Sequence, residues 1–336
     1  MRVVVLGGVL STGLGVGVLG EGRPARLGGA RTAEGVVAAV RDRLRRGELE
    51  LPLAGVDTVA RWSGLAALGR VDLALARLAE GHTDAVAVLA EAGRAVVAGA
   101  LYGVWASRSG GVGARLVDGR VDGTVRFCSG AGGLDRALVV ALDDTGAARL
   151  VEVDLAGPGI TSDPASWQAI GMDASDSADV RFDRVVPVAT VGPPGWYTDR
   201  KGFLLGGGGV AAVWLGGAAG VLDDVFDLLQ DKADEHQLAH LGALHAVVTS
   251  AATHLEHTAR LVDADTATEV HLATCRAVVE HAAWEVVDRV PRAVGPTPLS
   301  RDRAFAQRLA DLQVYVRQHH AERDLAALGR AVLAAR

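Results

Sequence analysis

Aromatic and hydroxyl side chains end two strand-like stretches of this 336-residue chain. Trp105 and Ser107 belong to the first stretch, and Phe127 and Ser129 belong to the second. Aromatic rings on strands usually pack in a protein core, and a serine beside them can bond a turn. From residue types alone we interpret this group as one face of a sheet, with a ligand site as the alternative.

Two adjacent histidines, His319 and His320, lie near the C-terminus in the stretch VRQHHAER. Histidine titrates near neutral pH, so an imidazole at this point is suited to proton transfer. A surface pair on the last helix is the alternative that the same residues allow.

Other histidines recur at helical spacing, in His236-x-x-x-His240 and His254-x-x-His257. A carboxylate-bridged di-iron bundle requires Glu-x-x-His motifs on two helices, and the sequence contains none. We therefore interpret these histidines as solvated helix-face residues and predict no metal site.

The first twenty residues, MRVVVLGGVLSTGLGVGVLG, are rich in glycine and apolar residues. They allow a secretory signal, a phosphate-binding loop on Gly15-x-Gly17-x-x-Gly20, or an irregular segment packed on the body. A dinucleotide-binding loop opens a helix, but the chain continues with Glu21-Gly-Arg-Pro24. Glycines weaken a helical signal, so we favour the irregular segment.

The composition is typical of a globular protein, with 49% hydrophobic and 22% charged residues. The net charge of −6 supplies no basic surface for nucleic acid. Cys128 and Cys275 lie in apolar surroundings and are expected to be buried thiols. Glycines interrupt the apolar N-terminal run, so we expect no membrane span and a cytoplasmic protein.

A strand-rich middle part must position the aromatic and hydroxyl residues. Strand candidates cover residues 101–107, 123–129, 136–142 and 148–153. The turn residues near and between them are Asp118-Gly119, Asp122-Gly123 and Asp143–Gly146. Strands and turns at this spacing predict a small antiparallel sheet or barrel.

Helical patterns flank the strands, over residues 32–46, 57–79 and 84–92 before them and 203–230, 234–264, 265–290 and 299–335 after them. The helix over 203–230 contains clustered glycines, which reduce helix stability unless another helix or a ligand packs very close. We predict an α+β fold with a glycine-rich segment and helical domain (1–93), a β domain (94–200) and a C-terminal four-helix bundle (201–336).

This order of elements, with several motifs, resembles the acyl-CoA dehydrogenase flavoprotein family. The stretch 123–130, GTVRFCSG, is similar to the family strand Gly-x-Lys-x-Trp-Ile-Thr-Asn, with Phe127 in place of Trp and Ser129 in place of Thr. The stretch 180–187, VRFDRVVP, is similar to a second family strand.

The resemblance implies a flavin-dependent oxidoreductase in which two strands contact the isoalloxazine ring of FAD. The residues that resemble these contact strands by position are Trp105, Ala106, Ser107, Phe127, Cys128 and Ser129. The resemblance also implies a small-molecule or acyl-thioester substrate and assembly as a homodimer or homotetramer.

Dehydrogenases of the family abstract a proton with a Glu of the C-terminal bundle, and this chain shows no clear counterpart. His319 and His320 lie near that point and resemble the flavin monooxygenase branch, in which a His helps activate a hydroperoxyflavin. An ungapped comparison places Gln318 there instead. The resemblance thus implies His319 and His320 as catalytic candidates and leaves dehydrogenation and monooxygenation both open.

The family's Arg-x-x-Phe-Gly segment, which binds the FAD pyrophosphate across a subunit interface, is not found. An acidic stretch, 230–240, takes its place, and Arg301, Arg303 and Arg308 are candidates to compensate. A non-catalytic relative that keeps the fold as a binding or scaffold subunit is therefore the alternative function.

Overall fold

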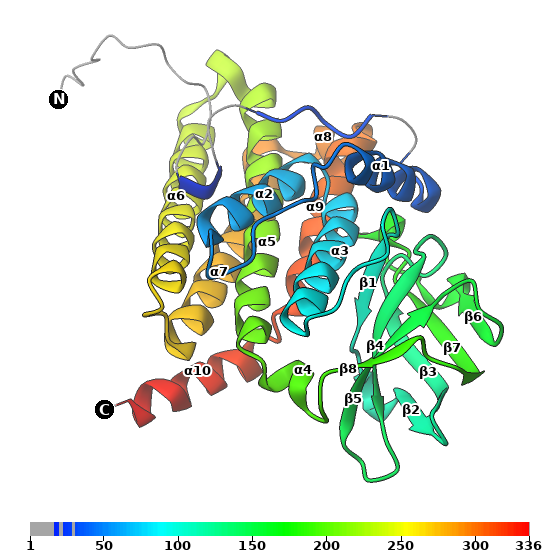
Figure 1. The fold of residues 1–336 in the computed structure, drawn as a ribbon. Helices are drawn as coiled ribbons and strands as arrows, with labels where there is room; N and C mark the ends of the chain where they lie inside the picture. The colour runs from blue at the N-terminus through cyan, green and yellow to red at the C-terminus, as the bar shows by residue number, and fades with distance from the viewer. Residues whose placement is uncertain (1–16, 20–22, 29–30, 336) are drawn as a thin grey trace.

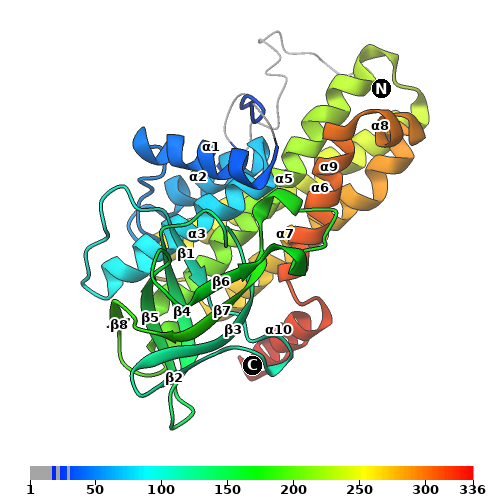
Figure 2. The same ribbon diagram turned by 90° about the vertical axis from the view of Figure 1, so that its right-hand side faces the viewer.

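The computed structural model describes residues 17–19, 23–28 and 31–335 of the chain. In this part, helices come before and after a single sheet, so the predicted α+β fold class is confirmed (Figures 1 and 2). The three interpretations of residues 1–20 fall outside the described residues, except at Gly17–Leu19, a short 3-10 turn in which Val18 and Leu19 are buried.

Three helices precede the sheet: α1 (Ala33–Arg45), α2 (Thr58–Val71) and α3 (Leu73–Glu91). Each begins at a capping residue whose side chain accepts a hydrogen bond from a backbone N–H of the first turn; these capping residues are Thr32, Asp57 and Asp72. The predicted division into helices over 57–79 and 84–92 is wrong, because the break falls at Asp72, which ends α2 and caps α3, and residues 80–83 lie inside α3.

The sheet contains eight strands in the described residues, in the order β6-β7-β3-β2-β4-β5-β8, with β1 beside β4. Their bounds are β1 Tyr102–Trp105, β2 Ala114–Val117, β3 Arg120–Cys128, β4 Arg136–Leu142, β5 Ala148–Asp154, β6 Ile160–Asp163, β7 Ala178–Val185 and β8 Ala189–Val191. Most pairs are antiparallel as predicted, but β1 and β2 each pair with β4 in parallel.

The two predicted Asp-Gly turns have different outcomes. Asp118 and Gly119 join β2 to β3 with positive φ angles of 49° and 70°, as a tight hairpin requires. The predicted turn at Asp122-Gly123 is wrong, because both residues lie inside β3. Gly123 has φ 107°, and the register between β3 and β7 shifts beside it, so this glycine serves a β-bulge.

Helices make up the C-terminal part: α4 (Trp196–Asp199), α5 (Lys201–Leu229), α6 (Glu235–Asp263), α7 (Glu269–Val294), α8 (Pro296–Arg301), α9 (Arg303–Tyr315) and α10 (Glu322–Ala334). The single helix predicted over 299–335 is wrong. Asp302 ends α8 and caps α9, and a connection made of a short 3-10 turn (Val316–Gln318) and residues 319–321 separates α9 from α10. α7 also continues past the predicted end, through Pro291.

The glycines of α5 allow it to pack against α2 backbone to backbone. A Cβ atom added at Gly216 would lie 2.0 Å from the carbonyl oxygen of Ala66, and one at Gly69 would lie 2.3 Å from that of Val213. The clustered glycines predicted that either a helix or a ligand packs very close to this segment, and the close neighbour is mainly the helix α2. Residues 201–232 are apolar enough to span a membrane, but 78% of their most apolar stretch is buried, as in a core helix.

Candidate functional site

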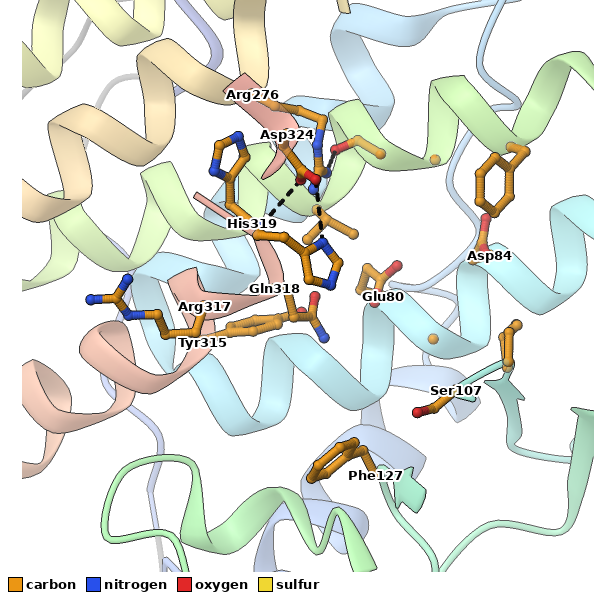
Figure 3. A pocket seen from close by; sticks show the side chains of 18 of the residues that line it. Glu80, Asp84, Ser107, Phe127, Arg276, Tyr315, Arg317, Gln318, His319 and Asp324 are labelled. Carbon is orange, nitrogen blue, oxygen red and sulfur yellow. Dashed lines mark hydrogen bonds and ion pairs between the residues drawn. The ribbon is translucent and has the colours of Figure 1, made fainter. Parts of the chain in front are cut away.

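A cavity of about 1350 Å³ lies between the sheet and the helices. Its walls come from the ends of β1 and β3, from α3, from the first turns of α5, from α7, and from residues 314–331. Figure 3 shows Phe127 and Ser107 of the sheet part on one side, with His319, Asp324 and Arg276 on the other. Ligand pockets typically measure about 300–1,000 Å³, so this cavity has room for a large ligand or for two.

The cavity brings together nearly all the site residues predicted from the sequence. Those that line it are Trp105, Ala106, Ser107, Phe127, Ser129, His319 and His320. Cys128 does not, because its thiol is fully buried and donates a 3.3 Å hydrogen bond to the carbonyl of Val125. Burial raises the pKa of the Cys128 thiol, which is therefore an inert core group.

Phe127 is turned out of the sheet into the cavity. Its φ of 60° lies in the left-handed region, at a second register shift between β3 and β7. The ring is 52% exposed and makes an edge contact with Trp167 at 6.4 Å between centroids. A phenylalanine at positive φ is strained, and such strain is concentrated at functional sites. The interpretation of Phe127 as core is therefore wrong.

Trp105 is both a core residue and a cavity-lining residue, the two roles that the sequence left open. It is only 2% exposed and packs in the core, yet it also borders the cavity. Its indole nitrogen donates to the backbone oxygen of Ser129 at 3.2 Å, which ties the end of β1 to the end of β3.

The Ser129 hydroxyl belongs to a buried polar chain. It accepts a 3.0 Å hydrogen bond from Nε of Arg77 and lies 2.8 Å from the hydroxyl of Ser177, which is 2.8 Å from that of Ser175. A serine hydroxyl has one donor and two acceptor positions, so these contacts leave Ser129 at most one further bond. Its orientation is fixed before any ligand arrives.

His319 lies in the connection between α9 and α10 and is only 3% exposed. Its ring makes an edge contact with Trp214 at 6.3 Å, and its Nδ1 atom has no hydrogen-bond partner. Burial lowers the pKa of His319, so this imidazole is neutral at pH 7. It is not part of a surface pair on a helix.

His320 is paired with a carboxylate of α10. Its Nδ1 atom lies 3.5 Å from Asp324, whose other oxygen accepts the backbone N–H of His320 at 3.1 Å. Burial acts to raise the pKa of Asp324, but this hydrogen bond and the nearby imidazoles outweigh it, so the net pKa is lowered. The ionised carboxylate can therefore orient the His320 ring.

Two carboxylates of α3 that were not predicted as site residues also line the cavity, namely Glu80 and Asp84. Glu80 forms an ion pair with Arg77, and Asp84 lies 3.8 Å from Arg200. Burial raises the pKa of both carboxyl groups. Their spacing of four residues on a helix indicates that both side chains lie on the same helix face, and this spacing could have identified them.

The arginines expected to replace the pyrophosphate segment do not line the cavity. Arg308 is buried, lies 3.5 Å from Asp224 and donates to the carbonyl of Val71 at 3.2 Å. Arg308 thus contributes to the packing of α9 on α2 and α5, and a role of the three arginines in binding a pyrophosphate stays a prediction. Arg301 is the last residue of α8, Arg303 is the first residue of α9, and both are exposed.

The histidines of α6 are not arranged as metal ligands; they are His236, His240, His254 and His257. In the described part of the chain, no group of three or more histidine, cysteine, aspartate or glutamate side chains is arranged to hold a metal ion. The absence of a metal in the functional protein stays a prediction.

Solved structures show which class of protein has this fold. The dibenzothiophene monooxygenase TdsC from Paenibacillus sp. A11-2 is 20% identical, with a TM-score of 0.73 over 90% of this chain and 96% of that one. KijD3 in complex with FMN and a dTDP-linked amino sugar is 18% identical, with a TM-score of 0.75 over 95% and 96%. Butyryl-CoA dehydrogenase from Megasphaera elsdenii is 17% identical, with a TM-score of 0.76 over 88% and 90%.

The chain therefore has the acyl-CoA dehydrogenase-like fold. Residues 194–316 match the family model described as acyl-CoA dehydrogenase, C-terminal domain. The resemblance inferred from the sequence is confirmed by these two findings. No curated protein matches the chain.

Proposed function

We propose that the cavity binds a flavin and that the protein is a flavin-dependent oxidoreductase of the monooxygenase type. The observation that carries this proposal is Phe127, held at positive φ with its ring half exposed on the cavity wall. A strained, exposed aromatic ring inside a large cavity suits stacking against a planar ligand. The FMN complexes of TdsC and KijD3, which share this fold, support the same choice.

The residues of the cavity fit a flavin in both shape and polarity. The β3 end offers the Phe127 ring and the fixed Ser129 hydroxyl to a tricyclic ring. Ser107, Arg108 and Gly110 line the same cavity, and the Arg108 guanidinium and the Ser107 hydroxyl are donors that suit a phosphate. We propose that this loop, residues 107–110, holds the flavin phosphate.

A bound flavin would supply the redox and oxygen chemistry, and the protein would supply position and protons. Asp324 holds Nδ1 of His320, which leaves Nε2 free to give or take a proton. His319 stays neutral and closes one wall of the cavity. We therefore propose His320 as the acid–base group and His319 as its neutral neighbour.

Monooxygenation is favoured over dehydrogenation by the connection between α9 and α10. This segment, residues 316–321, reads VRQHHA and contains no carboxylate. Removal of a proton next to a thioester carbonyl uses a Glu in the dehydrogenases that the chain resembles. We therefore propose a small-molecule substrate rather than an acyl thioester.

FAD is the cofactor that the resemblance implied, and the structure supports a choice of FMN instead. The family's pyrophosphate-binding segment is missing from the sequence, and Arg308 is committed to Asp224. A second phosphate needs further cations or helix N-termini. We propose that one chain binds FMN more tightly than FAD, and that tight FAD binding requires a homodimer or homotetramer.

Titration of the purified protein with FMN, FAD and riboflavin tests the cofactor proposal. The visible spectrum and the quenching of flavin fluorescence report binding, and light scattering reports the oligomeric state in the same samples. We expect FMN to bind more tightly than FAD and than riboflavin, which lacks the phosphate. If no flavin binds, the alternative of a non-catalytic scaffold subunit replaces the proposal.

A further inference from the structure

Three polar side chains surround the indole of Trp214, the large buried aromatic of α5. The guanidinium of Arg276 lies over the ring at 5.0 Å from its centroid. Tyr315 and His319 contact its edge at 6.5 Å and 6.3 Å between centroids. All three side chains line the cavity. They come from α7 (Arg276), from α9 (Tyr315) and from the connection after α9 (His319), and they form one part of the cavity wall.

The hydrogen-bonding capacity of this group is largely unused. The Tyr315 hydroxyl and Nδ1 of His319 are buried and have no hydrogen-bond partner. The hydroxyl lies beside the Arg77 guanidinium, but the geometry of a hydrogen bond is not met. A buried polar atom without a partner costs free energy, and native proteins rarely tolerate two together without a reason.

Arg276 is a cation without a matching carboxylate. It donates to the backbone carbonyl of Gly207, and among the described residues no carboxylate lies within ion-pair distance of it. Glu80 is paired with Arg77, and Asp324 lies beside His320 and Arg323. A guanidinium has five N–H donors, so Arg276 keeps donors for a ligand.

The cavity lining near this group is partly apolar and also includes the carboxylates Glu80 and Asp324, which are paired with other side chains. Val210 of α5 and Leu272 and Ala273 of α7 line the cavity near the polar group. An apolar wall with a few convergent polar groups is typical of a site that fixes the orientation of a small molecule. The polar groups here are a cation and a hydroxyl donor, with an imidazole whose tautomer is free to adapt.

We propose that the substrate carries an anionic oxygen, as a carboxylate or phenolate, on an apolar body, and that Arg276 and Tyr315 bind this oxygen with His319 beside them. This inference deepens the proposed function and rests on it only in calling the ligand a substrate. An anion would fill the unused donors of Arg276 and Tyr315, and desolvated charge-assisted hydrogen bonds of this kind are strong.

The phosphate of a flavin is the other source of anionic oxygens for the same groups. The two sources are separated by comparing two pairs of ligands. Benzoate and benzamide have the same shape and differ in charge, while FMN and riboflavin differ only in the phosphate. Isothermal titration calorimetry on the wild-type chain and its variants measures all four affinities.

The variants are Arg276→Gln and Tyr315→Phe, with Arg317→Gln as the matched control. Arg317 also lines the cavity and also lies over a tryptophan, Trp284, at 4.0 Å, but it is not at Trp214. Tyr315→Phe removes only an unpartnered hydroxyl, so it should fold at least as well as the wild type. It keeps the proposal testable if Arg276→Gln is unstable.

The expected result is that wild-type protein prefers benzoate to benzamide. Arg276→Gln should weaken benzoate binding by at least about ten-fold, and Tyr315→Phe by about three- to ten-fold, the range for charged hydrogen bonds. Benzamide and FMN affinities should stay unchanged, and Arg317→Gln should leave benzoate binding unchanged.

Two results would overturn the proposal. The first is that the wild-type protein binds benzoate and benzamide with equal affinity. The second is that Arg276→Gln loses affinity for FMN but keeps its affinity for riboflavin. The latter would assign Arg276 to the flavin phosphate. If the protein binds no flavin but still prefers benzoate to benzamide, the proposed redox function is wrong and the proposed anion site is still supported.

Discussion

At the scale of residues, the cavity depends on the backbone at Phe127. The pattern of β3 places an aromatic residue near the strand end, but the pattern alone cannot say which way the ring points. The direction is set by the register shift against β7, which lies more than fifty residues further along the chain. Side chains alternate along a strand, so a single bulge turned Phe127 outward and left Cys128 in the core.

His320→Asn tests the acid–base assignment at the same scale. Loss of the imidazole should slow the reoxidation of bound reduced FMN by oxygen by about 10²- to 10⁴-fold, the usual contribution of general acid–base catalysis. Stopped-flow absorbance measures this rate, and FMN affinity should be unchanged. His281→Asn, which alters an exposed histidine of α7, is the control.

His319→Asn refines the assignment. His319 is buried and neutral, so its loss should change the rate less than the loss of His320 does. A larger effect at His319 than at His320 would exchange their roles.

At the scale of elements, the sequence predicted helices where a capping residue and an apolar stripe coincide, as at Thr32 and Asp57. It missed the break at Asp72, because that residue caps α3 inside a continuous apolar pattern. It also missed the connection after α9, where Ala321 adopts a positive φ of 43° without glycine to signal it. That connection contains His319 and His320. The two histidines were therefore predicted as site residues, although the local structure that positions them was not predicted.

The glycine contacts between α2 and α5 give a prediction at this scale. Gly216→Ala should lower the free energy of unfolding by about 2–3 kcal/mol, because the new Cβ atom would overlap the Ala66 carbonyl. Chemical denaturation measures this change. Gly242→Ala, at an exposed glycine of α6 with no neighbour within 4 Å, should raise stability by about 0.5–1 kcal/mol. Equal effects would show that α2 and α5 pack less closely than described.

At the scale of the whole molecule, most of the helices and most of the sheet share one hydrophobic core. Ion pairs join its distant segments: Arg31 contacts Asp72 at 2.9 Å, Asp173 at 2.6 Å and also Asp311. Asp311 in turn accepts the backbone N–H of Met172, which lines the cavity. The cavity wall is thus fixed by segments far apart in the sequence, and local patterns could not predict it.

His82 connects α3 to the sheet and gives the fold a defined acid sensitivity. Its Nδ1 atom accepts the backbone N–H of Tyr102 at 3.2 Å, and burial lowers its pKa from 6.5 to about 4. The unfolded chain therefore binds more protons between these values, and stability falls as pH drops from about 6.5 to 4. The loss reaches about 3 kcal/mol below pH 4.

His82→Asn removes this titration and retains an acceptor for the Tyr102 N–H. The difference in unfolding free energy between wild type and variant, measured by urea denaturation from pH 7.5 to 4.5, should shift in favour of the variant as the pH falls. A difference that does not change with pH would mean that His82 is not buried as described. His281→Asn again provides the control.

A crystal structure of the protein with FMN would show directly where the cofactor binds. We expect an isoalloxazine ring in the cavity between the β3 end and the connection after α9, beside Phe127 and Ser129 and facing His320. An FMN bound elsewhere, or a Phe127 ring that closes the cavity against FMN, would contradict it.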